Sequence, residues 1–572
     1  MSPVLAAQTE TLILWAEITK ILFVFAYGAC VGSLTNVLVY RLPRGMGVVV
    51  PSSACPNCHH TLSWKDNIPV LGWLALRGRC RYCRNPISPE YPLVELLVGL
   101  LFVLFYVLWY GLDQFTGPLS GTTLFLGLDL GQIQPEWASN GLGRTWPLFV
   151  MLLILVGSLV AMTIVDAKTF MIPLVLAWTP AIVGVAGHLG QYLLEANARR
   201  GWMWTPDWSY AIATPGRTGW PWVGVALGGM LGIALSLLLM KLGLLKRSFA
   251  DYDDWEAAER AKRGLPPLEP LASADDAPTE PPDAIRAVPD AALGPVSPAE
   301  PREDPAGTET SSKANPAPWP ASVRLATRRW LTIAAAVIAL AAVGGVVASL
   351  FDLVPAIGVL IGALLGPIPG GLIANRLAPV PDEPDPDEPP EESPTDLWLE
   401  YPHARREMLR ELLFVGPAIV LALLGASIAW NLGGPWTTDP VSFTPVPTDT
   451  VPRWLEILSG SLLGYLIGGG VVWGVRILGS LLFRKEAMGL GDVHLMAGVG
   501  ACLGWIDPTL AFFLAAPIGL YIELLRRVIS GGRRAAMPFG PSLAIAVLIV
   551  LLAKPWLAEA MTAWMHRPIR LP

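Results

Sequence analysis

The chain has 572 residues, of which 53% are hydrophobic and only 15% are charged, and its mean hydropathy is +0.49. This composition excludes an ordinary soluble globular domain and is typical of a protein that crosses a membrane several times. The formal net charge of −6 says little about partners, because the acidic residues are concentrated in two polar segments. We expect membrane lipid as a partner and no nucleic acid.

Apolar stretches recur along the chain. A hydrocarbon core of about 30 Å needs roughly 20 apolar residues per helix, and about twelve stretches meet this requirement. The first, Leu12 to Tyr40, is too long for a cleaved signal peptide, and no basic residue precedes it. The sequence therefore predicts an all-α, polytopic transmembrane helical bundle, with its first helix within residues 1–40.

A polar loop follows at residues 41–91, and basic side chains outnumber acidic ones in it. Its basic residues are Arg41, Arg44, Lys65, Arg77, Arg79, Arg81 and Arg84, and its acidic residues are Asp66 and Glu90. Loops rich in Lys and Arg stay on the cytoplasmic side of a membrane, so we expect this loop inside and the N-terminus outside.

Two CxxC pairs lie in this loop, Cys55 with Cys58 and Cys80 with Cys83, separated by 21 residues. Four thiolates at such a spacing can hold one tetrahedral structural zinc ion. The loop has few apolar runs, so a bound metal would supply stability that its small core cannot. The sequence predicts a small zinc-stapled cytoplasmic loop domain.

Two other arrangements use the same loop. The four cysteines could form a pair of disulfides, although such bonds rarely persist in the reducing cytoplasm. His59 or His60 could replace one sulfur, although four cysteines already complete the coordination shell.

Residues 92–245 are predicted to be transmembrane helices, and one of these ends at Asp166, shortly before Ile172-Pro173. A carboxylate at the edge of a membrane segment is expensive and indicates a functional site. The simpler alternative is a side chain that snorkels to the interface or caps a helix, and for a single residue we prefer it. Alternation of the spans places Asp166 on the cytoplasmic side.

Three segments then separate this part from the C-terminal helices. Residues 246–329 are predicted to be a disordered cytoplasmic insert, because Asp251 to Pro320 contains 14 prolines in 70 residues. Residues 330–375 are predicted to form an inserted transmembrane hairpin. Residues 376–410 alternate proline with acidic residues and predict a solvated linker.

Residues 411–572 are predicted to be further transmembrane helices, and they contain the run Met488-Gly489-Leu490-Gly491-Asp492. Alternation places Asp492 on the same side as Asp166. Two carboxylates that share a proton can activate water, so the pair predicts a membrane aspartyl protease with Asp166 and Asp492 as its catalytic residues. Gly489 and Gly491 would let the backbone approach an extended substrate without obstruction.

Three further charged residues and two glycine spacings in the apolar stretches are expected to have structural roles. Glu95 either lies near the two aspartates or begins a helix, and we prefer the second interpretation. Glu17 and Lys20, three residues apart on one helix, are expected to neutralise each other. The GxxxG-like spacings at Gly224–Gly228 and Gly460–Gly464 permit close helix contact but are common in membrane helices.

Several motifs occur in one order along the chain. They are Gly32-Ser-Leu-Thr-Asn-Val-Leu-Val-Tyr-Arg-Leu-Pro43, the CxxC pairs around Asp66-Asn-Ile-Pro69, Pro86-Ile-Ser88, Tyr91-Pro-Leu-Val-Glu95, Asp166 with Ile172-Pro173, Glu486-Ala-Met-Gly-Leu-Gly-Asp492 and Pro538-Phe-Gly-Pro-Ser-Leu-Ala544. Together they resemble the type IV prepilin peptidases, which are bacterial GxGD aspartyl proteases. The resemblance covers residues 20–195 and 455–550, and it implies Asp166 and Asp492 as catalytic residues and the four cysteines as metal ligands.

The resemblance also implies a function. The family removes the leader peptide of type IV prepilins or type II secretion pseudopilins at the cytoplasmic face of the bacterial inner membrane. Many members then methylate the new N-terminus with S-adenosylmethionine, a further cofactor that we expect only by analogy, since no GxGxxG-like loop is present. The alternatives are a peptidase without methyltransferase activity and a catalytically inactive zinc-stapled assembly or transport protein.

Two features depart from the family pattern. His494 stands where the family often has Lys, and residues 220–455 have no counterpart.

Overall fold

The computed structural model describes residues 3–111, 133–263 and 403–571, together with 124–125, 128–129 and several residues between 332 and 373. Within the long ranges, the residues left out are 51, 56, 200–209, 213, 216–218, 250, 435, 439–444, 448–449, 484–486, 531–537 and 567–570.

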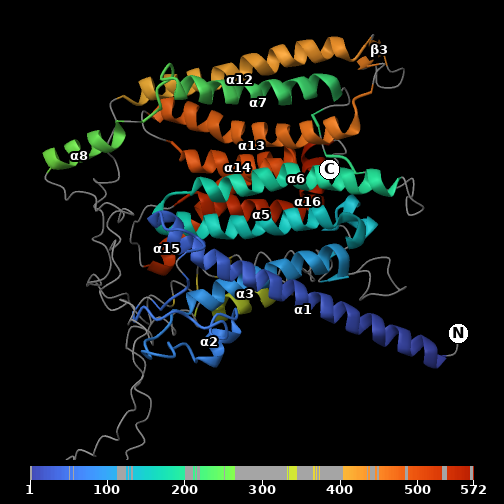
Figure 1. Cartoon of the computed structure of the whole chain (residues 1–572), viewed down its shortest axis with the longest axis vertical. Helices are drawn as coiled ribbons and strands as arrows, with labels where there is room; N and C mark the ends of the chain where they lie inside the picture. The colour runs from blue at the N-terminus through green and yellow to red at the C-terminus, as the bar shows by residue number, and fades with distance from the viewer. Residues whose placement is uncertain are drawn as a thin grey trace, which may run out of the picture.

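A bundle of long apolar helices makes up the described part (Figure 1). Nine of the helices described are long and apolar enough to cross a membrane. The helices concerned are α1 (Pro3–Arg41), α3 (Glu90–Tyr106, continued by the π-turn η2, Val107–Gly111), α5 (Leu142–Thr169), α6 (Leu174–Ala198), α7 (Gly219–Lys241), α12 (Ala404–Leu432), α13 (Arg453–Phe483), α15 (Ile506–Ser530) and α16 (Gly540–Met565). The all-α, multi-pass class is confirmed, while most of the predicted hairpin at 330–375 lies outside the described residues.

Shorter elements connect these helices. They are η1 (Leu42–Arg44), α2 (Leu71–Ala75), η5 (Glu136–Asn140), α8 (Tyr252–Arg263), α14 (Leu490–Leu503) and two antiparallel hairpins, β1 (Leu124–Phe125) with β2 (Leu128–Asp129) and β3 (Trp436–Thr438) with β4 (Pro445–Pro447). Helix α14 has 14 residues, so at 1.5 Å per residue it is about 21 Å long and too short to span a bilayer.

The two ends of the bundle differ. The loop with α2 and the helix α8 lie at one end, at the left in Figure 1, and β3 lies at the other. Because consecutive long helices run in opposite directions, the end of α5 and the start of α14 both lie at the α2 end. Asp166 lies in the last turn of α5 and Asp492 in the first turn of α14, so the two predicted catalytic aspartates share one end of the bundle.

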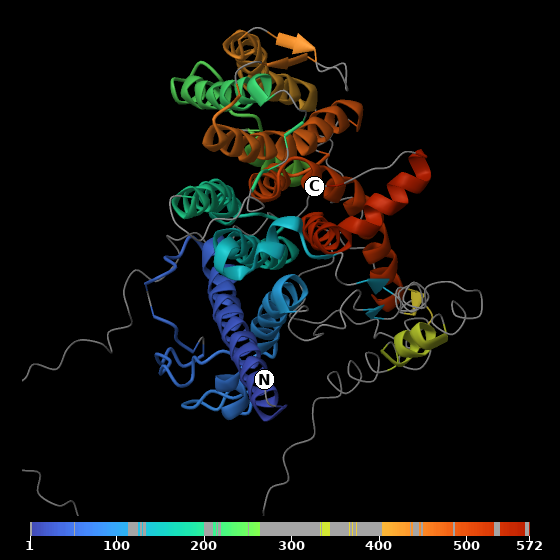
Figure 2. The same cartoon turned by 90° about the vertical axis from the view of Figure 1, so that its right-hand side faces the viewer.

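The core is centred on α5. Helices α1 and α3 lie on one side of α5, and α6, α14 and α13 separate it from α7 and α12 on the other (Figures 1 and 2). Leu148, Leu152, Leu155 and Leu159 of α5 are almost completely buried. The outer faces of α7 and α12 expose leucines such as Leu231 and Leu423, as expected for side chains that face lipid.

Glycines allow three of the closest helix contacts. A Cβ added to Gly224 would lie 2.1 Å from the carbonyl oxygen of Gly425, and one added to Gly228 would lie 2.1 Å from that of Leu421. Likewise, a Cβ at Gly464 would lie 1.9 Å from the carbonyl oxygen of Gly500. Both glycines of the Gly224–Gly228 spacing therefore make the close helix contacts that it permits, whereas in Gly460–Gly464 only Gly464 does so, because Gly460 faces the side chain of Ile212.

Two segment boundaries differ from the predictions. Tyr252–Arg263, at the start of the insert predicted to be disordered, forms helix α8, and residues 264–329 lie outside the described residues. The prolines of this insert begin at Pro266, so the preceding stretch keeps the strong helix formers Ala, Glu, Lys and Arg without a helix breaker. Helix α12 begins at Ala404, within the predicted linker 376–410.

Candidate active site and metal centre

Asp166 lies in the last turn of α5, and its side chain is buried. The helix ends because Phe170 adopts a left-handed conformation (φ 54°) and donates its N–H to the Asp166 carbonyl at 2.9 Å. The first residue of α16, Gly540, donates its backbone N–H to Oδ2 of Asp166 at 3.0 Å. A Cβ at Gly540 would lie only 2.5 Å from that oxygen, so this approach requires glycine.

Asp492 lies in the first turn of α14 and is also buried. Gly489 precedes the helix in an extended conformation, and a Cβ there would lie 3.7 Å from Oδ2 of Asp492. Gly491 packs against Ile172, since a Cβ at Gly491 would lie 2.9 Å from Cβ of Ile172. Ile172 belongs to the turn that follows Asp166, so this contact joins the segment after α5 to the first turn of α14.

The contact between Gly491 and Ile172 thus brings together the segments that carry Asp166 and Asp492, two buried aspartates whose charges interact. His494, one of the departures from the family pattern, lies further along α14, where its ring centroid is 6.4 Å from that of Trp178.

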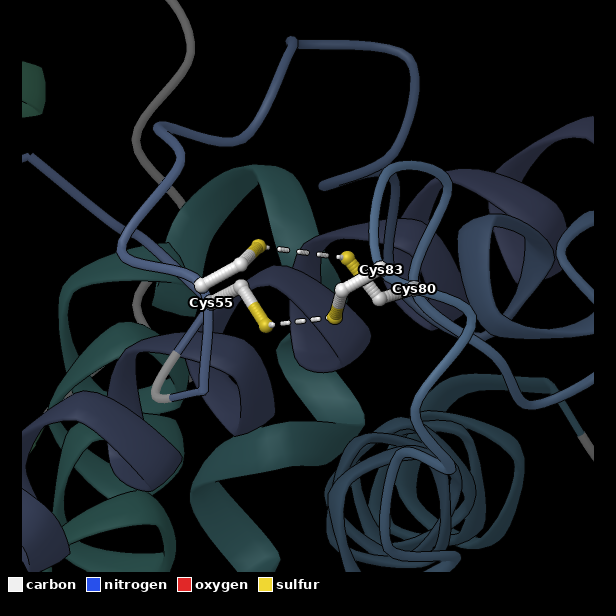
Figure 3. Close-up of side chains that lie close together, drawn as sticks. Cys55, Cys80 and Cys83 are labelled. Atoms are coloured by element: carbon white, nitrogen blue, oxygen red, sulfur yellow. Dashed lines mark hydrogen bonds between the residues drawn. The ribbon is translucent and has the colours of Figure 1, made fainter.

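The four predicted cysteines converge in the loop between α1 and α3 (Figure 3). Their sulfur atoms all lie within 4.8 Å of one another, with 3.8 Å between Cys55 and Cys83 and 4.0 Å between Cys58 and Cys80. A tetrahedral site with Zn–S bonds of about 2.3 Å has sulfur–sulfur edges of about 3.8 Å. The cluster can therefore hold a metal ion, and its size fits zinc.

The two CxxC pairs repeat one backbone pattern. Cys55 donates its N–H to the His60 carbonyl at 3.0 Å, and Cys80 donates to the Asn85 carbonyl at 2.9 Å. The residue after each pair, His59 or Arg84, has a positive φ, which closes the turn around the thiols. The arrangement resembles two matching halves of one metal-binding unit.

The structure favours neither of the two alternatives for this loop, a pair of disulfides or a histidine ligand. All six cysteines of the chain are unpaired, so no disulfide is formed. Among the described residues, the group of possible metal ligands consists of the four cysteines alone, and the ring centroid of His60 lies 3.6 Å from that of Tyr82. The backbone N–H groups of Cys83 and Tyr82 lower the pKa of the Cys80 thiol to about 6, which favours the metal-binding thiolate.

Glu95 has a role that the sequence interpretation missed. It lies near the start of α3, in the second turn, where it is buried, and its Oε2 accepts the N–H of Val70 at 2.7 Å. Val70 has a positive φ (61°), a costly conformation for a β-branched residue. Glu95 therefore fixes the cysteine-bearing loop onto the bundle, and its place in the Tyr91–Glu95 motif was the only sequence signal for this.

An ion pair stabilises the same loop. Arg81 donates from Nε and Nη2 to the Asp66 carboxylate, with the Nη2–Oδ1 distance at 2.5 Å. Hydrogen bonding from Arg81 holds the pKa of Asp66 below its usual value. At the opposite end of the bundle, Lys20 and Glu17 pair at 2.6 Å as predicted, and Glu17 also accepts the Tyr106 hydroxyl at 2.9 Å.

Fold and site together define a multi-pass membrane protein with a buried pair of aspartates at one end and, beside the bundle at that same end, a four-cysteine cluster that can hold a metal ion. Residues 26–109 match the family model of the bacterial peptidase A24 N-terminal domain. The resemblance to the type IV prepilin peptidases is therefore confirmed.

Proteins named prepilin leader peptidase/N-methyltransferase are similar to this chain. The protein of Myxococcus xanthus (strain DK1622) is 59% identical over 80 residues, which are 14% of this chain and 24% of that protein. The Klebsiella pneumoniae protein is 44% identical over 113 residues (18% and 47%), and that of Aeromonas hydrophila is 29% identical over 257 residues (38% and 77%). The chain thus spans less than half the length of the first two relatives, and no solved structure matches it.

Proposed function

We propose that this chain is a membrane aspartyl endopeptidase that removes the leader peptide of type IV prepilins or type II secretion pseudopilins. The observation that carries the proposal is the meeting of Asp166 and Asp492, from distant parts of the sequence, at one end of the bundle. The printed names of the relatives, prepilin leader peptidase/N-methyltransferase, support the same reaction.

The proposed chemistry is hydrolysis of one peptide bond. Two carboxyl groups this close do not both ionise readily, so the pair acts with one shared proton. The ionised carboxylate takes a proton from water, whose oxygen attacks the scissile carbonyl carbon, while the protonated partner donates a hydrogen bond to the carbonyl oxygen. Collapse of the tetrahedral intermediate breaks the C–N bond, and the departing nitrogen takes up the proton that the carboxylate had removed from water.

Each neighbouring group has a place in this scheme. The N–H of Gly540 occupies Oδ2 of Asp166, which leaves Oδ1 for the water or the shared proton. Gly489 and Gly491 support the turn before Asp492 and keep side chains away from an extended substrate.

The proposed site faces the cytoplasm of a bacterial inner membrane. The basic loop 41–91 lies at the same end of the bundle as both aspartates, and the excess of Arg and Lys marks that end as the inner one. A prepilin has an apolar helix preceded by a short basic leader, so its cleavage site would lie at this depth of the membrane.

The four-cysteine centre is proposed to bind zinc through Cys55, Cys58, Cys80 and Cys83. A bound zinc ion would cross-link the two halves of the loop, a structural rather than a catalytic contribution.

Methylation of the new N-terminus is a second proposed activity. It rests on the relatives' name, and it would require S-adenosylmethionine as the methyl donor. Mass spectrometry of the mature pilin N-terminus would detect it as a gain of about 14 mass units. An unmodified N-terminus would leave a peptidase without methyltransferase activity.

Co-expression with a prepilin tests the peptidase. We expect Asp166→Asn and Asp492→Asn each to abolish leader removal while the protein still accumulates in the membrane. Asp254→Asn is the matched control, because Asp254 is an exposed aspartate on α8. Normal leader removal in both active-site variants would refute the proposal and favour an inactive assembly or transport protein.

A further inference from the structure

Glu411, on the inserted helix α12, contacts Arg476 of α13, and Arg476 in turn contacts the backbone next to the candidate active site. We propose that Arg476 of α13 is a positioning residue for the turn Gly489–Asp492, and that Glu411 of the inserted helix α12 holds Arg476 in place. The proposal deepens the proposed peptidase function and rests on it.

Arg476 and Glu411 form a buried ion pair. Nε of Arg476 lies 3.1 Å from both carboxylate oxygens of Glu411, and Nη2 lies 2.9 Å from Oε1. Both side chains are about 3% exposed. The guanidinium is therefore held in a single orientation by a fork of hydrogen bonds.

The remaining nitrogen of the guanidinium reaches the active-site turn. Nη1 of Arg476 donates a hydrogen bond to the backbone carbonyl of Met488, the residue before Gly489. One helical turn further along α13, Ser480 Oγ accepts the N–H of Ala487 at 3.0 Å. Two groups on one face of α13 thus fix the backbone that leads into the turn.

The opposite side of the turn contacts the segment after Asp166, since Gly491 packs against Ile172. The turn is therefore held between the two parts of the site, by Ile172 on one side and by Arg476 on the other. The charge of Arg476 also acts on the Asp492 carboxylate.

The inserted region supplies the surroundings of this arginine. Glu411 accepts two further hydrogen bonds, from Trp473 Nε1 at 2.9 Å and from Ser248 Oγ at 3.3 Å. The ring of Phe249 lies 5.4 Å from the guanidinium carbon. Ser248 and Phe249 follow α7, and α7 packs closely against α12 through the glycine contacts described above, so α7 and α12 together support Arg476.

A buried ion pair of this kind contributes more to geometry than to stability. Replacing both partners by apolar residues of similar volume is often neutral for folding, whereas removing one partner leaves an uncompensated charge. The informative variant is therefore the double replacement Glu411→Leu with Arg476→Met, which removes the link to Met488 without leaving either partner as an unpaired buried charge.

The matched control is a second ion pair away from the site, in which Asp507 is buried and the side chain of Lys554 is 24% exposed. Nζ of Lys554 lies 2.9 Å from Oδ2 of Asp507. Asp507 is the second residue of α15, which follows the C-terminal end of α14, whereas Asp492 lies at the N-terminal end of α14. Asp507→Leu with Lys554→Met makes the same chemical change there.

Purified full-length variants would be compared by prepilin cleavage kinetics and by hydrogen exchange of the amides from Gly489 to Asp492. We expect the Glu411/Arg476 double variant to lose kcat by about 10- to 100-fold with KM little changed, and to exchange these amides about tenfold faster. Arg476→Lys, which keeps the charge but not the fork, should fall between this variant and the wild type. The control pair should change neither readout.

The outcomes separate the two proposals. Unchanged exchange in the Glu411/Arg476 variant, or unchanged kcat with an active wild type, would overturn the role of Arg476. Equal changes in the control pair would also overturn it, because they would indicate a general loss of packing. If the wild type does not cleave any prepilin while the exchange still responds, the peptidase function fails and the positioning role stands.

Discussion

Replacing Gly540 by alanine should disable the site with the smallest change that the chain allows. The first N–H of α16 reaches Asp166 because Gly540 has no side chain. A Cβ at this position would lie 2.5 Å from Oδ2 and 3.1 Å from Cγ of Asp166. Ordinary carbon–oxygen contacts begin near 3.4 Å, so the carboxylate or the helix end must move by about 1 Å.

A displacement of about 1 Å at a reacting group typically lowers the rate about 100-fold. This corresponds to about 2.7 kcal/mol in the activation free energy. The loss should fall on kcat, because the displaced carboxylate is proposed to act in the chemical step.

The assay is prepilin cleavage by purified protein in lipid nanodiscs, with the thermal unfolding midpoint recorded for each variant. Gly474→Ala, in the middle of α13, is the control, because a Cβ there meets nothing within 4 Å. It should keep full activity and gain slightly in helix stability, about 1 kcal/mol at most. Cleavage by Gly540→Ala within about threefold of the wild type would refute the argued geometry around Asp166.

Three further outcomes follow from the loop and the helix contacts. Purified protein should contain one zinc ion per chain, and Cys80→Ser should lose it and make residues 41–91 sensitive to protease; a protease-resistant loop without metal would contradict this. The lowered pKa of Asp66 means that its ion pair with Arg81 stabilises the loop at neutral pH, and that this stabilisation is lost as the pH falls through that pKa. The protease resistance of the loop should therefore fall in acid. Arg81→Gln should make the resistance less dependent on pH. Gly228→Leu should separate α7 from α12 and lower the unfolding midpoint by several degrees, whereas Gly416→Leu, which meets open space, should not; equal effects would argue against that contact.

Local patterns in the sequence identified candidate residues that the fold brings together. Asp166 and Asp492 were identified by short motifs and assigned to one side by loop charge, and the fold places both at the same end of the bundle. The four cysteines were predicted from spacing alone, because a CxxC turn brings its two thiols together whatever surrounds it.

The supporting contacts could not be predicted in the same way. Glu95 with Val70, Gly540 with Asp166 and Arg476 with Glu411 each join residues that are far apart in sequence, and no local periodicity encodes such pairs. In helices that are apolar on all sides, hydrophobic periodicity does not indicate which face meets which neighbour. The register of the bundle is set instead by glycine contacts, whose partners only the fold reveals.

Helix α3 links the cysteine loop to the candidate site through two contacts. We expect the buried Val70–Glu95 hydrogen bond to matter more than the exposed Lys168–Glu90 pair. Lys168, two residues after Asp166, pairs with Glu90 at the start of α3, but both side chains are about half exposed, so this pair contributes at most about 1 kcal/mol. Glu95, one turn further along α3, is buried and holds the strained Val70 of the loop. Loss of metal should therefore disturb the site mainly by breaking the hydrogen bond from Val70 to Glu95, which would leave the buried Glu95 carboxylate without its donor. Glu95→Gln, which can still accept the Val70 N–H, should preserve activity, whereas Glu95→Leu should mimic metal loss in a cleavage assay. Equal activity of these two variants would show that the loop and the aspartate pair are independent.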